Sequence, residues 1–167
     1  HNLPDRARET YSATLARSEF LRFAEAARGA LPDDRPLADS CDCMSAAFDG
    51  IEAICAAEAE ESPDGDRAGC VLLSEVPDFF VEATGRLRAV CDEYLRRDYE
   101  NAAPLFEDMR AALRQFGECA ALADETFSFY CESVGGECTA QLMCLDPSRL
   151  LDEAMKRAVS TSLFSAT

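Results

Sequence analysis

The chain of 167 residues contains a single histidine, His1, and a single lysine, Lys156. Nucleophilic catalysis by Ser or Cys usually depends on a histidine that acts as the general base. Because the only histidine is the first residue, we expect no Ser-His-Asp or Cys-His arrangement inside the fold. A Gly-x-x-x-x-Gly-Lys loop, which P-loop enzymes use to bind nucleotide phosphates, is also missing. We therefore expect no independent catalysis from this chain.

Positive charge is scarce as well. The chain has 16 Lys and Arg residues against 32 Asp and Glu residues, which gives a net charge of −16. Affinity for nucleic acids comes largely from cations that neutralise phosphates, so this balance argues against an isolated DNA-binding module. The acidic excess is explained most simply by solubility, and it also suits a domain that borders a DNA path without gripping it.

The densest group of basic residues is a weak candidate for contact with single-stranded DNA. It consists of Arg86, Arg88, Arg96 and Arg97. Pairing of these arginines with Asp92, Glu93 and neighbouring acids along a helix explains the same pattern at least as well.

Long apolar runs are absent, and none approaches the roughly 18 to 20 residues that span a bilayer. We therefore expect no membrane partner and a cytoplasmic location. The nine cysteines are odd in number and include no Cys-x-x-Cys pair, so neither a disulfide framework nor a zinc site is expected. Cys131, Cys138 and Cys144 should lie near one another, but we interpret them as reduced thiols. A cysteine-based metal or redox protein is a weaker alternative.

Apolar residues recur at helical spacing in four segments separated by short breaks. The clearest stripe has intervals of four, three, four, three and four residues and consists of Leu37, Cys41, Met44, Phe48, Ile51 and Cys55. The other three helices are expected from Pro4 to about Leu31 with one slip near Ser18, from Val76 to Tyr94, and from a cap at Asn101 to Ala120. Four amphipathic helices predict an antiparallel bundle over about residues 4–122.

The pattern changes in the last quarter of the chain. Thr126–Cys131 and Cys138–Cys144 have an alternating character and flank Gly135-Gly136, which predicts a β-hairpin. A short helix should follow from Asp146-Pro147-Ser148, and Thr161–Phe164 should form a terminal strand.

The predicted fold class is therefore mainly α. It is an antiparallel helical bundle with a small β-hairpin and a terminal strand near the C-terminal end. We expect one domain over residues 1–167, in which residues 126–167 hold the hairpin, the short helix and the terminal strand.

Three short segments match motifs of a known family in order along the chain. His1-Asn2 matches the last residue of an Asp-Glu-Ala-His motif and the Asn that commonly follows it. The segment 142–148, Leu-Met-Cys-Leu-Asp-Pro-Ser, matches the point where the chain re-enters a motor domain, and Leu163–Thr167 matches motif III. The chain thus resembles the arch-domain region between motifs II and III of the XPD/DinG family of superfamily 2 DNA helicases.

This resemblance covers the whole chain and implies a fragment of an ATP-dependent DNA helicase of repair or replication. The parent would translocate 5′ to 3′ on single-stranded DNA, and the arch would help enclose the path of that strand. By resemblance His1 would couple the nucleotide γ-phosphate to other motifs. Ser165, Ala166 and Thr167 would form the motif III-like segment that transmits the nucleotide state towards the DNA cleft.

The same resemblance implies where partners and cofactors belong. The fragment itself would hold no cofactor, whereas the parent would use ATP, Mg²⁺ and an iron–sulfur cluster whose cysteines precede His1, outside this chain. Its partners would be single-stranded DNA and the remaining motor domains. Since motifs II and III lie on neighbouring strands in the family, His1 and Thr167 should lie together at one end of the bundle, beside the hairpin.

Two alternatives stay open at this point. Composition and helical spacing alone favour an acidic helical interaction module that binds a basic protein partner through one face. It is also possible to explain the ends without a helicase, with His1 as a residue left from cloning and the tail as an ordinary strand.

Overall fold

The structure is a computed structural model that describes residues 3–57, 60–61, 67–97 and 99–157. Within these residues it contains six helices and five strands. In chain order they are α1 (Leu3–Thr10), β1 (Ala13–Ala16), α2 (Arg17–Ala30), α3 (Arg35–Ala57), β2 (Glu60–Glu61), β3 (Arg67–Leu73), α4 (Asp78–Arg97), α5 (Tyr99–Leu122), β4 (Phe127–Val134), β5 (Glu137–Cys144) and α6 (Ser148–Arg157).

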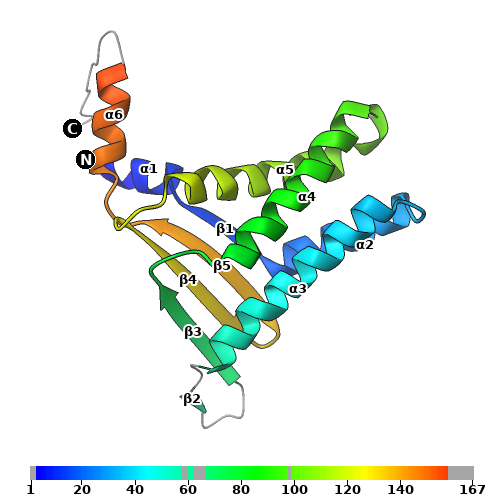
Figure 1. Cartoon of the computed structure of the whole chain (residues 1–167), viewed down its shortest axis with the longest axis horizontal. Helices are drawn as coiled ribbons and strands as arrows, with labels where there is room; N and C mark the ends of the chain where they lie inside the picture. The colour runs from blue at the N-terminus through cyan, green and yellow to red at the C-terminus, as the bar shows by residue number, and fades with distance from the viewer. Residues whose placement is uncertain (1–2, 58–59, 62–66, 98, 158–167) are drawn as a thin grey trace, which may run out of the picture.

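The strands form one antiparallel sheet in the order β1-β5-β4-β3-β2. Figure 1 shows the long helices α2, α3, α4 and α5 gathered on one side of this sheet. Of these, α2, α3 and α5 pack along the strands, whereas α4 packs on α3 and α5 and reaches β4 through Phe80. The other side of the sheet carries no helix among the described residues. The mainly α fold class is confirmed, but the helices cover a sheet instead of packing only on one another.

The predicted hairpin is present as β4 and β5, which pair over their whole length from Phe127–Cys144 to Val134–Glu137. Gly135 and Gly136 form its turn with φ angles of 59° and 85°. A two-residue turn of type I′ needs positive φ at both central positions, which glycine adopts without strain. The Gly-Gly pair therefore sets both the place of the turn and the register of the two strands.

The single helix expected from Pro4 to about Leu31 is wrong, because the segment divides into α1, β1 and α2. Burial alternates along β1, with Ala13 and Leu15 only 6% and 5% exposed and Thr14 exposed. The break coincides with the slip in the apolar pattern near Ser18. β1 pairs with Thr139–Leu142 of β5, and this pairing satisfies backbone groups that the hairpin would otherwise leave open at its edge.

The sequence pattern also missed β3, which lies between the second and third expected helices. Its residues Gly69–Leu73 pair with Phe129–Ser133 of β4, so the hairpin forms the centre of a larger sheet. A hairpin alone is marginally stable in water, and additional strands or a covering helix are needed to hold it. The cap expected at Asn101 is wrong too, since α5 already begins at Tyr99. The terminal strand expected at Thr161–Phe164 lies outside the described residues.

Phenylalanines from four elements form the centre of the core. The ring of Phe80 on α4 lies 5.4 Å from that of Phe48, 5.5 Å from that of Phe116 and 6.0 Å from that of Phe129. These partners belong to α3, α5 and β4, and all four rings are at most 1% exposed. Edge-to-face aromatic pairs add to the free energy of burial. This cluster joins the three longest helices to the sheet.

Asp34 caps the N-terminus of α3. Its carboxylate accepts a hydrogen bond from the backbone N–H of Leu37 at 2.9 Å, which satisfies a free donor of the first turn. A hydrogen bond from the Tyr94 hydroxyl, and then the one from Leu37, lower the pKa of Asp34. Burial and the contact with Asp34 raise the pKa of Tyr94 to about 12. The cap thus also joins α3 to the last turns of α4.

Replacement of Phe80 by alanine should lower the free energy of unfolding by about 3–5 kcal/mol, because it leaves a cavity between α3, α5 and the sheet. Urea unfolding followed by circular dichroism measures the change. The neighbouring Val81 is 39% exposed, so Val81→Ala should change the free energy by no more than about 0.5 kcal/mol. Equal effects of the two substitutions would contradict the assignment of Phe80 to the centre of the core.

Replacement of Asp34 by alanine should cost about 0.5–2 kcal/mol of stability at neutral pH, the usual range for a lost N-cap. The folded pKa of Asp34 is lowered, so its stabilisation is present above the unfolded value of about 4 and is lost as pH falls through the folded pKa. Unfolding curves of wild type and Asp34→Ala should therefore converge in acid. The exposed neighbour provides the control, because Asp33→Ala should leave stability unchanged at every pH.

Candidate functional site

The motif residues named from the sequence fall at the two ends of the chain. His1, Ser165, Ala166 and Thr167 all lie outside the described residues. The structure does describe the helices closest to them, α1 and α6. The expected proximity of the two ends can therefore be judged only from α1, which follows His1, and from α6, which precedes Ser165.

α1 and α6 lie at the same end of the sheet (Figure 1). Arg8 of α1 donates a hydrogen bond from Nε to the carbonyl oxygen of Leu145 at 3.0 Å, three residues before α6 begins. The backbone N–H of Cys144 donates to Ser12 Oγ at 2.9 Å. Gln115 of α5 donates from Nε2 to the carbonyl oxygen of Thr10 at 2.7 Å. We call this meeting of segments the junction.

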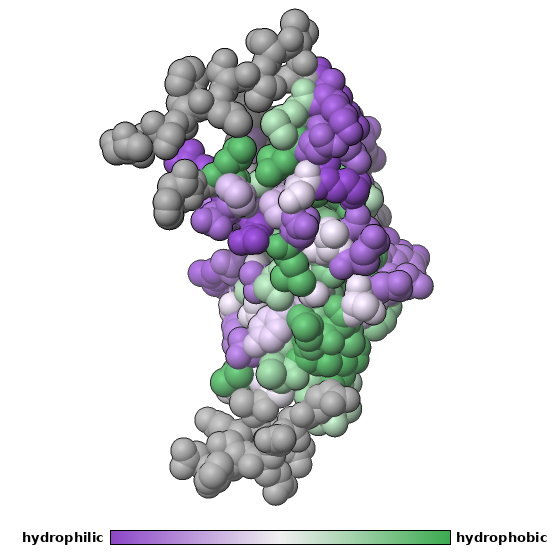
Figure 2. All heavy atoms as spheres, turned by 90° about the vertical axis from the view of Figure 1, so that its left-hand side faces the viewer, coloured by the Kyte–Doolittle hydropathy of each residue, from purple (hydrophilic) through white to green (hydrophobic). Residues whose placement is uncertain are grey.

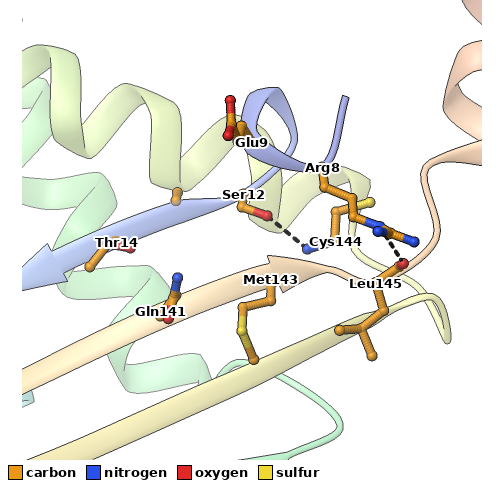
Figure 3. A pocket seen from close by; sticks show the side chains of 9 residues that line it. Arg8, Glu9, Ser12, Thr14, Gln141, Met143, Cys144 and Leu145 are labelled. Atoms are coloured by element: carbon orange, nitrogen blue, oxygen red, sulfur yellow. Dashed lines mark hydrogen bonds between the residues drawn. The ribbon is translucent and has the colours of Figure 1, made fainter. Parts of the chain in front are cut away.

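A cleft of about 560 Å³ lies beside the junction, between the end of α1 and the strands β1 and β5 (Figure 3). Its charged groups are Arg8 and Glu9, and the other side chains are neutral; the lining consists of Arg8, Glu9, Ser12, Ala13, Thr14, Gln141, Met143, Cys144 and Leu145. Burial raises the pKa of the Cys144 thiol, which lowers the fraction of reactive thiolate at neutral pH. The cleft therefore combines two opposite charges, Arg8 and Glu9, with a mostly neutral lining.

The four arginines proposed for DNA contact lie on α4. Arg86 pairs with Glu82 at 3.4 Å, and both Arg96 and Arg97 pair with Glu93. These pairs are exposed and join residues three or four apart on one helix, so each contributes a few tenths of a kcal/mol at most. The alternative of pairing with nearby acids thus describes these three arginines, whereas Asp92 pairs with Arg110 of α5.

Arg88 differs from the other three because its side chain is turned towards α5. Its Nε is buried and has no hydrogen-bond partner among the described residues, and a guanidinium nitrogen lies near Gly117 of α5. A group held against a neighbouring helix is less available to a DNA strand than an exposed arginine. The structure therefore does not bring the four arginines into one cationic surface.

Seven of the nine cysteines are buried, and only Cys70 is exposed. Burial raises the pKa of Cys41 to about 11 and those of Cys131 and Cys138 to about 12. These thiols behave as small apolar groups of the core. Among the described residues there is no group of three or more His, Cys, Asp or Glu side chains arranged to hold a metal ion.

The uncovered side of the sheet is a feature that the sequence pattern did not reveal. Its outward-facing side chains, which we call the open face, are Thr14, Ala16, Cys70, Leu72, Ser128, Tyr130, Glu132, Thr139, Gln141 and Met143. Seen from the sheet side, hydrophobic residues gather in the middle and lower part of the molecule (Figure 2). The apolar run Val71-Leu72-Leu73 was the available signal, because it predicts a strand that is apolar on both faces.

No protein-family model matches the chain, and a search of curated proteins finds no match to it. Among the helices of the described residues, none combines the length and the apolar character needed to cross a bilayer.

The difference in thiol exposure can be measured directly. In native protein a thiol reagent such as DTNB should react fast with Cys70, more slowly with the half-buried Cys43 and far more slowly with the seven buried cysteines. In guanidinium chloride all nine should react. Cys70→Ser should remove the fast phase, and a fast phase that persists in this variant would contradict the placement of β3 at the surface of the sheet.

Proposed function

We propose that this chain is the arch-domain region of an ATP-dependent DNA helicase of the XPD/DinG type, and that its role is to enclose the path of single-stranded DNA. The order of the three motif-like segments in the sequence is the basis of the proposal. The observation that carries it furthest is the junction. A domain inserted between two adjacent motifs must receive and return the chain at one place. In agreement with this, α1 and α6 lie at the same end of the sheet, and Arg8 of α1 donates a hydrogen bond to Leu145 just before α6.

The junction has the properties that such a connection needs. Hydrogen bonds from Arg8, Cys144 and Gln115 fix the last turn of α1 against the end of β5 and against α5. Movement of a motor domain would thus be passed to the sheet through β1 and β5 without a flexible hinge at this point. The cleft between these elements is available for a neighbouring surface of the motor.

The charge of the chain fits a boundary role. A net charge of −16 repels the phosphate backbone, so the strand would be guided past this domain and held by the motor domains instead. ATP, Mg²⁺ and the iron–sulfur cluster would belong to those domains. On this proposal the helices and the sheet serve as a rigid wall, and the chain by itself has no catalytic part.

The flanking gene sequence gives the most direct test. Codons for Asp-Glu-Ala directly before His1 and for Leu-x-Pro directly after Thr167 are expected. In the full gene product, His1→Ala should reduce ATPase activity stimulated by single-stranded DNA by about a hundredfold or more, the scale of losing a group that stabilises the transition state. Lys156→Ala on α6 is the matched control and should leave the rate unchanged.

The purified 167-residue chain should hydrolyse no ATP above the buffer rate. ATP hydrolysis by this chain alone, or flanking codons that encode neither motif, would contradict the proposal. The outcome of both measurements is independent of whether the open face binds a partner.

A further inference from the structure

The open face mixes polar side chains with three large apolar or aromatic ones. Antiparallel sheets commonly place apolar residues inside and polar residues outside. Here the outward positions of the inner strands include Leu72, Tyr130 and Met143, and Leu72 is 62% exposed. Leu145, at the end of β5, is 52% exposed, and Val134, at the other end of the hairpin, is 43% exposed. A patch of this kind marks a surface that another molecule covers.

Cross-strand neighbours make the patch continuous. Leu72 lies opposite Tyr130, which lies opposite Gln141, and Gln141 lies opposite Thr14 at the edge of the sheet. Met143 pairs with Ser128 in the next row, so neutral side chains extend from β3 to β5 and reach the cleft beside the junction. The result is one continuous surface in which Leu72, Tyr130 and Met143 are the large apolar or aromatic side chains.

The charged side chain on the open face is acidic. Glu132 is its only charged side chain, and it lies beside Tyr130 and Cys70 at the lower end of the sheet. Glu137 follows at the same end, and Asp146 lies beyond Leu145 at the other. No Lys or Arg is among the ten side chains of the open face. Two basic residues lie at its borders, since Arg8 lines the cleft and Arg67 is the first residue of β3.

These charges select between possible occupants. A nucleic acid would meet a carboxylate on the face itself and no cation there to neutralise its phosphates. A second copy of the chain would bring another net charge of −16 against the same acidic groups. A basic protein surface would gain from both the apolar centre and these carboxylates, because opposite potentials speed encounter and fix orientation.

We propose that the open face is a docking surface for a protein partner that presents an apolar patch rimmed by Lys and Arg. Leu72, Tyr130 and Met143 form its centre, where burial of apolar area supplies most of the affinity. Glu132 supplies the acidic charge on the face itself. Glu137 and Asp146 add negative charge at its two ends, where their carboxylates also accept hydrogen bonds from the backbone N–H groups of Ser18 and Ser148. This surface is independent of the helicase assignment, since it uses neither the motif residues nor the chain ends.

Two model helical peptides with the same apolar face test the proposal. One consists of leucine and lysine and the other of leucine and glutamate in the same positions, each with a fluorescent label. Fluorescence anisotropy at low salt should show the lysine peptide binding at least about tenfold more tightly, the equivalent of roughly 1.4 kcal/mol. Its affinity should fall as salt rises.

Neutral polar substitutions then locate the binding surface without altering the net charge. Leu72→Asn and Met143→Asn should each weaken the lysine peptide by about fivefold or more, because they remove apolar area from the centre. Leu21→Asn on α2 is the matched control, since Leu21 is 46% exposed outside the open face and should have no effect. Hydrogen exchange should show protection of β3 and β4 when the peptide is bound.

Circular dichroism checks that each variant is folded before binding is compared. Four results would overturn the proposal: equal affinity for the two peptides, equal effects of Leu72→Asn and Leu21→Asn, dimerisation in sedimentation experiments that Leu72→Asn abolishes, or binding of a single-stranded oligonucleotide that Leu72→Asn abolishes. The third would identify a second copy as the occupant and the fourth a nucleic acid.

Discussion

The packing of Phe80 against Phe48, Phe116 and Phe129 is the contact on which the rest of the structure depends. These rings come from α4, α3, α5 and β4, so one cluster unites the helical layer with the centre of the sheet. Through this cluster the helices pack on one side of the sheet, and among the described residues no helix covers the other side. The position of β4 in turn determines where β3, β5 and the open face lie, and β5 determines where the junction forms.

The structure separates three regions with different physical character. The core contains most of the cysteines, and burial raises the pKa values of their thiols. On the surface of α4, Arg86, Arg96 and Arg97 form ion pairs with glutamates of the same helix. The open face and the junction remain as the parts with features beyond stability. We therefore base both proposals on the surfaces that the described residues present to other molecules.

Much of the fold could be predicted from the sequence where the signal was local. The apolar stripe from Leu37 to Cys55 matches α3, and Gly135-Gly136 locates the hairpin, because helical spacing and positive φ are properties of short segments. β1 and β3 could not be predicted in the same way. Ala13–Ala16 has too few residues for a strand signal, and it becomes a strand through pairing with β5. The candidate site depends on both missed strands.

The sequence by itself determined the mainly α composition, the hairpin turn, the acidic charge and the presence of a single histidine, since each depends on residue type and local spacing. Only the tertiary structure decided that the helices cover one side of a sheet, that Arg88 turns towards α5 while its neighbours pair in solvent, and that Leu72 is exposed. The physical reason is the same in each case. Strand pairing and burial are set by contacts between residues far apart in the chain, and no local pattern records them.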